Sequence, residues 1–93
     1  MSQKTVITTD QTITLFSPLT TGDGKTLNEI TMRVPKRKDI AKSQRHSKDP
    51  VEAETFLFHL LTGLTMEDIG ELTLADSNQL SDMFRQFHGR DNN

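Results

Sequence analysis

The chain has no cysteine, tryptophan or tyrosine among its 93 residues, and only three prolines. Without cysteine it can form neither a disulfide framework nor a thiolate metal site. Its longest apolar cluster, residues 56 to 64, is far shorter than the roughly 20 residues that span a bilayer. The first ten residues also lack the apolar segment of a signal peptide. We therefore expect a soluble, intracellular protein, and the apolar fraction of 32% predicts a thin core.

Charge is distributed unevenly along the chain, although the net charge is only −2. Residues 33 to 48 carry seven basic side chains and one acidic one, whereas the residues from 49 onward carry nine acids and two arginines. Three interpretations of the basic segment remain open: a purely structural role, as a solvated face or in pairing with the chain's own acidic half; contact with an acidic protein partner; or phosphate binding. No aromatic residue interleaves with the basic ones, so base stacking is not provided and nucleic acid is the least favoured partner.

Alternating apolar residues predict a β-hairpin in the first half of the chain. Residues 12 to 17 place Ile13 and Leu15 on one face, and we expect Pro18 to end this strand. The turn-forming residues 20 to 25 follow, and a second strand over 26 to 34 should then end at Pro35. A two-stranded hairpin is unstable alone, so helices must cover one face.

Three or four short helices are predicted to follow. The polar segment 36 to 47 is either a helix or a loop, and helix is preferred. Asp49, Pro50 and Glu52 form a start signal for a helix over 50 to 62, with Asp49 as N-cap and Glu52 bonding back to its amide. Thr65 should cap a short helix and Thr73 a final one reaching residue 89. The predicted fold is a single α+β domain over residues 12 to 89, with flexible tails at 1 to 11 and 90 to 93.

The sequence offers little for catalysis. His46, His59 and His88 are scattered and form no metal-binding spacing, and the chain has neither a nucleophile elbow nor a phosphate-binding loop. We therefore predict that the protein is not an enzyme and needs no cofactor or metal.

A partner-binding surface is the remaining functional hypothesis. The stretch from residue 55 to 64 has more large apolar residues than one helix stripe requires, and Phe58 falls outside that stripe, so we expect Phe58 to be exposed for a partner. The candidate residues combine this helix with the basic segment: Arg33, Lys36, Arg37, Lys38, Lys42, Arg45, Phe56, Phe58, Leu61 and Leu64.

Four segments together resemble a known family. They read ITLFSP from residue 13, EITMRVPKRKD from residue 29, LTGL from residue 61 and IGELTLAD from residue 69. In their order and spacing, over residues 12 to 84, they are similar to the small tail assembly chaperones of contractile-tailed phages and Mu-like prophages, often described as E, 41 or 14.

The resemblance implies a non-enzymatic assembly factor of the host cytoplasm that is absent from the finished virion. Its partner would be the tape measure protein, which it would keep soluble, with tail tube subunits as a second partner and self-association as a further option. The alternative is a small nucleic-acid-binding regulator that uses residues 33 to 48. Binding to nucleic acid that falls steeply with salt would favour that alternative.

Overall fold

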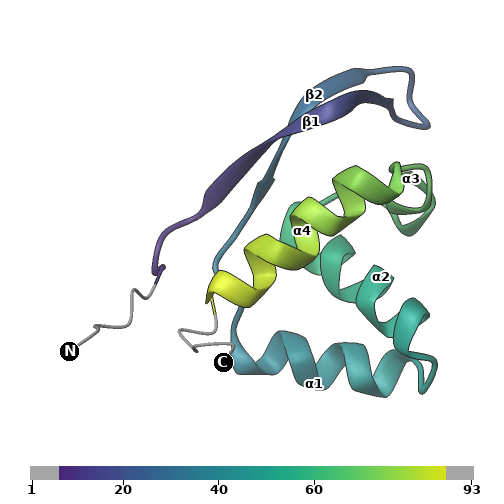
Figure 1. Cartoon of the computed structure of the whole chain (residues 1–93). Helices are drawn as coiled ribbons and strands as arrows, with labels where there is room; N and C mark the ends of the chain where they lie inside the picture. The colour runs from purple at the N-terminus through teal and green to yellow at the C-terminus, as the bar shows by residue number, and fades with distance from the viewer. Residues whose placement is uncertain (1–6, 88–93) are drawn as a thin grey trace.

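A two-stranded antiparallel hairpin followed by four helices makes up residues 7–87, the part of the chain that the computed structural model describes (Figure 1). This arrangement confirms the predicted α+β fold class. The segment 36 to 47 contains a helix, as preferred. Residues 1 to 6 of the expected N-terminal tail, residues 88 and 89 of the expected last helix, and all of 90 to 93 lie outside the described residues. The elements are β1 (Gln11–Thr20), β2 (Thr26–Met32), α1 (Arg37–His46), α2 (Pro50–Thr62), α3 (Met66–Gly70) and α4 (Leu74–Phe87).

The hairpin turn forms as its composition predicts. Gly24 has a φ of 88°, which glycine adopts without steric cost, and its N–H donates to the Thr21 carbonyl at 2.9 Å. The Thr21 N–H donates to the Lys25 carbonyl at 2.8 Å, which closes the loop. Ile13 pairs with Ile30, and both side chains are buried on the face that meets the helices. Residues of alternate parity, such as Thr12 and Thr31, lie exposed on the other face.

Pro18 does not end the first strand, contrary to the sequence prediction. β1 continues to Thr20, and the regular pairing is interrupted between Thr14 and Leu19. Over that interval residues 15 to 18 of β1 lie opposite the single residue Asn28 of β2. A bulge leaves some residues outside the hydrogen-bonding ladder, so a proline without an N–H is accommodated there.

The second strand ends earlier than predicted, at Met32, so Val34 is half-buried outside the strand. Beyond Met32 the chain stops pairing with β1 and bonds to other segments. The Arg33 N–H donates to the Leu61 carbonyl of α2 at 3.0 Å, and the Val34 N–H donates to Asp10 Oδ1 at 3.1 Å. These two bonds direct the chain away from the sheet before Pro35.

Most predicted helix boundaries are confirmed. Asp49 caps α2 by accepting a hydrogen bond from the Val51 N–H at 3.1 Å, and Gly63 ends the helix with a φ of 81°. Thr65 caps α3 by accepting from the Asp68 N–H. The predicted bond from Glu52 back to the Asp49 amide is absent among the described residues. The Ser47 hydroxyl accepts that N–H instead.

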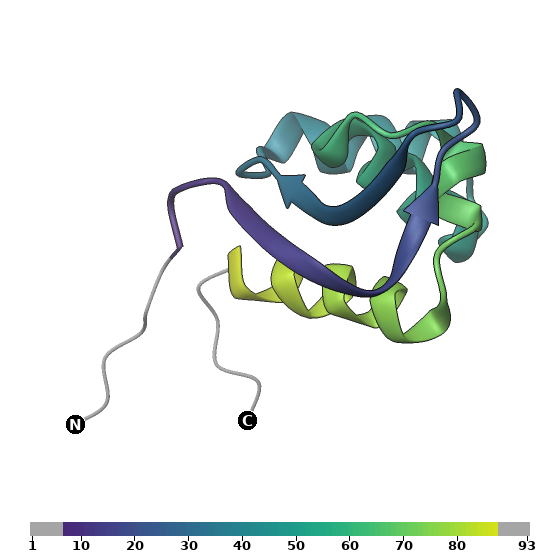
Figure 2. The same ribbon diagram turned by 90° about the horizontal axis from the view of Figure 1, so that it is seen from above.

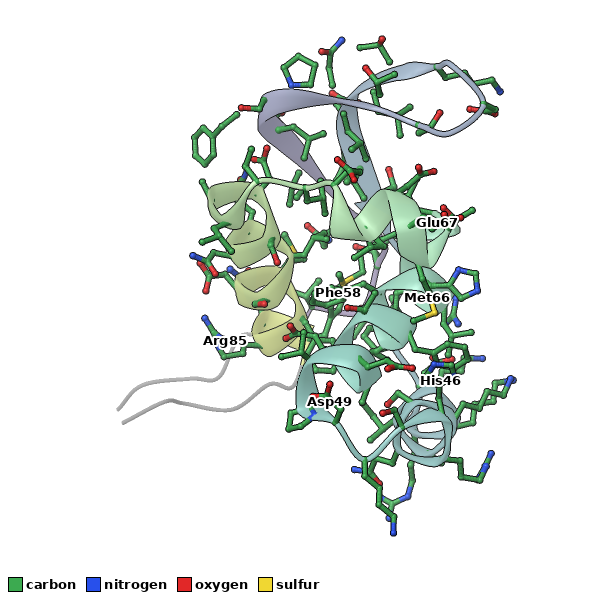
Figure 3. The ribbon with its side chains drawn as sticks, turned by 90° about the vertical axis from the view of Figure 1, so that its right-hand side faces the viewer. His46, Asp49, Phe58, Met66, Glu67 and Arg85 are labelled. Atoms are coloured by element: carbon green, nitrogen blue, oxygen red, sulfur yellow. The ribbon has the colours of Figure 1, made fainter. Side chains whose placement is uncertain are left out.

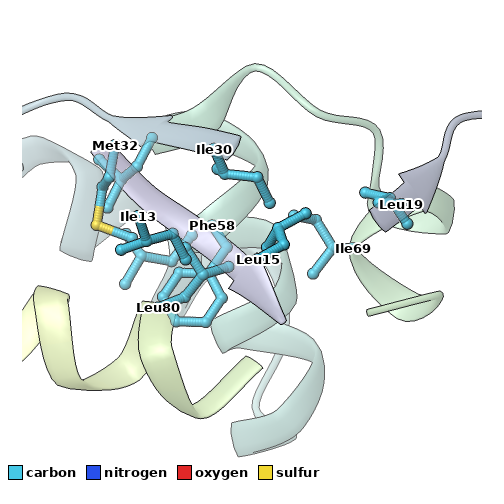
Figure 4. Packing of buried hydrophobic residues seen from close by; sticks show 10 residues of the cluster. Ile13, Leu15, Leu19, Ile30, Met32, Phe58, Ile69 and Leu80 are labelled. Carbon is cyan, nitrogen blue, oxygen red and sulfur yellow. The ribbon is translucent and has the colours of Figure 1, made fainter. Parts of the chain in front are cut away.

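The hydrophobic core lies between the hairpin and the helices (Figures 2 and 4). In Figure 2, α4 runs along β1, and α2 packs against β2, α1 and α3. The buried apolar side chains are Ile13, Leu15, Leu19, Ile30, Met32, Leu57, Phe58, Leu61, Ile69 and Leu80.

Phe58 belongs to this core, so the prediction that it is exposed is wrong. Only 2% of its surface is accessible, and Figure 3 shows it in the interior, whereas Glu67 and Arg85 lie at the periphery. The prediction assumed that α2 buries only one side. In the structure α1, α3 and β2 all pack against this helix, so more than one side is buried. None of the described helices combines the length and the hydropathy that crossing a membrane requires.

Candidate functional site

An ion pair between the partly exposed Arg33 and the buried Asp39 fixes the start of the basic segment. Arg33 Nη1 and Nη2 donate to the two carboxylate oxygens of Asp39 at 2.9 and 2.8 Å. Asp39 Oδ2 also accepts the Lys36 N–H at 2.8 Å, and the Asp39 N–H donates to the Lys36 carbonyl at 2.9 Å. This reciprocal pairing starts α1 after Pro35. The Arg33 guanidinium, opposed by burial and helped by the Lys36 amide, lowers the pKa of Asp39 to about 2.

Replacing this carboxylate gives a pH-dependent prediction. Asp39→Asn should lower the free energy of unfolding by about 1–2 kcal/mol at pH 7, a value reduced because the Arg33 side chain is 40% exposed. The folded-state pKa is below the ordinary value of 3.8, so this stabilisation is present above about pH 4 and lost as the pH falls towards 2. Urea denaturation from pH 7 to pH 2 should show the wild type and the variant converging. Asp82→Asn, at an exposed position, is the control, and a constant difference for Asp39→Asn would contradict the assignment.

The other basic residues form an exposed surface on and beside α1, called here the cationic face. Within residues 7–87 none of its six members forms an ion pair with an acidic side chain. The chain's own acidic half therefore forms no direct ion pair with the cationic face in the described part of the structure. Its members are Lys36, Arg37, Lys38, Lys42, Arg45 and Lys48.

The four apolar candidates do not form one surface with these cations. Phe58 and Leu61 are buried in the core. Phe56 is half-buried, and its ring stacks on His46 with centroids 4.1 Å apart. Leu64 is half-buried near the hairpin turn. Of these four residues, Phe56 contacts the end of α1 through His46, whereas the other three lie in the core or near the hairpin turn.

A second buried carboxylate, Asp76, joins α4 to the bulge of β1. It accepts the N–H groups of Phe16 at 2.8 Å and Ser17 at 3.1 Å, and it also accepts from Gln79 and Thr73. Burial raises the pKa of Asp76, but these four hydrogen bonds outweigh it and leave the pKa below its usual value. The carboxylate supplies the acceptors that the interrupted ladder lacks, so its role is structural.

The exposed apolar residues are ones that the sequence did not single out. Phe16, Val51 and Leu74 are exposed by 74%, 72% and 83%. Phe16 precedes Pro18 in the bulge, and Leu74 begins α4, so the Asp76 network brings their backbones near each other. The alternation of residues along β1 places Phe16 on the face opposite Ile13 and Leu15, and this alternation is the sequence signal that predicts its exposure.

The described part of the chain has several hollows, and one of about 430 Å³ lies between α1 and α2. Two others lie near the hairpin turn and near the end of α4. One, of about 630 Å³, lies between the hairpin turn and α3, with Leu27 and Leu64 among its lining and several carboxylates around it. The other, of about 160 Å³, lies between the start of α1 and the end of α4. The acidic side chains of the hollow at the hairpin turn are Asp23, Glu67, Asp68 and Glu71. Among the described residues there is no group of three or more His, Asp or Glu side chains that could hold a metal ion.

Comparison with known proteins gives a family. No curated protein and no solved structure matches the chain. Residues 12–89 match the model of the family described as phage tail assembly chaperone proteins, E, or 41 or 14, and the chain therefore belongs to this family.

Proposed function

We propose that this tail assembly chaperone binds the tape measure protein of the same phage or prophage and keeps it soluble in the host cytoplasm while the tail assembles. The observation that carries the proposal is the family match over residues 12–89. A tape measure protein is long and helical, so before assembly it presents apolar surface that a small chaperone can cover. Tail tube subunits are a second candidate partner, and the chaperone would not remain in the finished virion.

The surface of the chain supports protein binding. The cationic face offers six exposed charges, and within residues 7–87 none of them forms an ion pair with an acidic side chain. Charges of this kind steer an acidic partner and raise the association rate more than they raise affinity. Of the residues that the sequence suggested for binding, Lys36, Arg37, Lys38, Lys42 and Arg45 keep this role in the proposal. Phe58 and Leu61 do not, because a partner cannot reach them in the folded chain.

Co-expression tests the proposal. The tape measure protein from the same genome should be several-fold more soluble when this chain is present, and the two should co-purify. The control is an unrelated protein of the same size expressed at the same level. No rise in soluble tape measure protein, together with no co-purification, would refute the proposal.

A further inference from the structure

The hollow between α1 and α4 joins two segments that lie far apart in the sequence. Pro35 and Ile40 line one side, and Phe84 and Phe87 line the other. All four side chains are half-buried within residues 7–87, and they form the apolar part of the lining of this α1–α4 pocket. In Figure 1 the yellow end of α4 lies beside the start of α1.

The volume of the pocket limits what it can accept. About 160 Å³ is well below the 300–1,000 Å³ that is typical of cofactor and small-molecule sites. It suits one large apolar side chain. In many protein interfaces a few anchor side chains, buried in well-packed pockets, supply most of the binding energy.

The rim of the pocket adds a charge requirement. Lys36 and Arg37 lie at the pocket and are exposed, and Lys38 follows directly. Arg33, by contrast, is held by Asp39 and is not available. An occupant would therefore gain from carboxylates placed beside its apolar anchor, and basic residues there would be repelled.

We propose that the α1–α4 pocket anchors an acidic amphipathic helix of the partner. One leucine or phenylalanine of that helix enters the pocket, and Asp or Glu residues three or four positions away, on the same helix face, lie against Lys36 and Arg37. The inference rests on the proposed function only in identifying the helix as part of the tape measure protein.

A peptide assay tests the pocket independently of the tape measure protein. The probe is a fluorescein-labelled 18-residue helix with leucines at helical spacing and glutamates on its flanks. The wild-type chain should bind it, and the same peptide with lysine in place of every glutamate should bind at least about tenfold more weakly. Equal binding of the two peptides, or binding of neither, would overturn the proposal.

Two substitutions and their controls locate the site. Arg37→Glu should weaken binding of the acidic peptide by about tenfold, and Lys25→Glu, the same kind of charge reversal at the hairpin turn, should not. An acid at the first position of α1 is favourable to the helix dipole, so Arg37→Glu should fold normally. Phe87→Ser should also weaken binding by about tenfold, whereas Phe87→Leu should largely retain it. If Lys25→Glu weakens binding as much as Arg37→Glu, the pocket is not the site.

The same variants separate this inference from the proposed function. If the wild type solubilises the tape measure protein and Arg37→Glu and Phe87→Ser do so equally well, the proposed function stands and the pocket is not its site. If the wild type fails there but binds the acidic peptide with the predicted losses, the pocket stands and the tape measure assignment fails. If ultracentrifugation shows a wild-type dimer that both variants disrupt, and no peptide binds, the occupant is a second copy and the inference is wrong.

Discussion

Phe58→Ala is expected to lower the free energy of unfolding by about 3–5 kcal/mol, because Phe58 is the largest fully buried side chain of the described core. The side chain is only 2% exposed and packs among Leu57, Leu61 and the buried residues of the hairpin. Removing the ring loses the free energy gained by transferring it from water into the core. It also leaves a cavity that the surrounding side chains fill only in part, because the interior is close-packed. Small domains have total stabilities of about 5–15 kcal/mol, so this single change would remove a large share. Urea denaturation followed by circular dichroism measures it.

Phe16→Ala is the matched control because it removes the same atoms from a side chain that is 74% exposed. Its effect on the free energy of unfolding should stay within about 0.5 kcal/mol. If the two variants are equally stable, Phe58 does not occupy the core. If Phe58→Ala is destabilised as expected, a loss of partner binding in this variant could result from unfolding alone. Arg37→Glu is expected to fold normally, so a loss of binding there reports on the surface itself.

Asp76→Ala is expected to lower the free energy of unfolding by about 2–4 kcal/mol. The substitution removes the acceptor of the Phe16 and Ser17 amides, of Thr73 and of Gln79 in one step. Those amides lie in the bulge of β1, where the ladder to β2 is interrupted and offers no replacement acceptor. Loss of the carboxylate should therefore loosen the bulge as well as the first turn of α4.

Hydrogen exchange distinguishes this explanation from a general loss of stability. In Asp76→Ala the amides of Phe16 and Ser17 should lose more protection than the amide of Ile30, which lies in the regular part of the sheet. Asp82→Ala, also on α4 but exposed and paired with Arg85, is the control and should change stability by less than about 1 kcal/mol. A uniform loss of protection across the sheet would contradict the assigned role of Asp76.

The burial of Phe58 on α2 excludes it from the partner-binding surface that the sequence predicted. The sequence placed Phe58 outside a single apolar stripe and so left it for a partner. The structure surrounds α2 with α1, α3 and β2, and on such a helix more than one face is buried. A pocket with half-buried apolar side chains lies instead between the start of α1 and the end of α4, beside the charges that the sequence had already singled out.

The basic segment also has one property that its composition predicts and one that depends on the tertiary structure. Its composition indicated a charged surface, and six of its seven cations do lie exposed. Nothing local to the sequence showed that Arg33 would be committed to a buried Asp39, because that pairing depends on how the chain turns after β2.

By itself the sequence determined where the hairpin turns, where α2 begins and ends, and where α3 begins. The caps at Asp49 and Thr65 and the glycines at 24 and 63 act within a few residues of their own positions, so their effect can be read locally. Only the tertiary structure decided that Pro18 would lie in a bulge, that Asp76 would hold that bulge from 60 residues away, and that Phe58 would be covered. These outcomes depend on contacts between segments that are distant along the chain, and the periodicity within one helix or strand does not encode its neighbours.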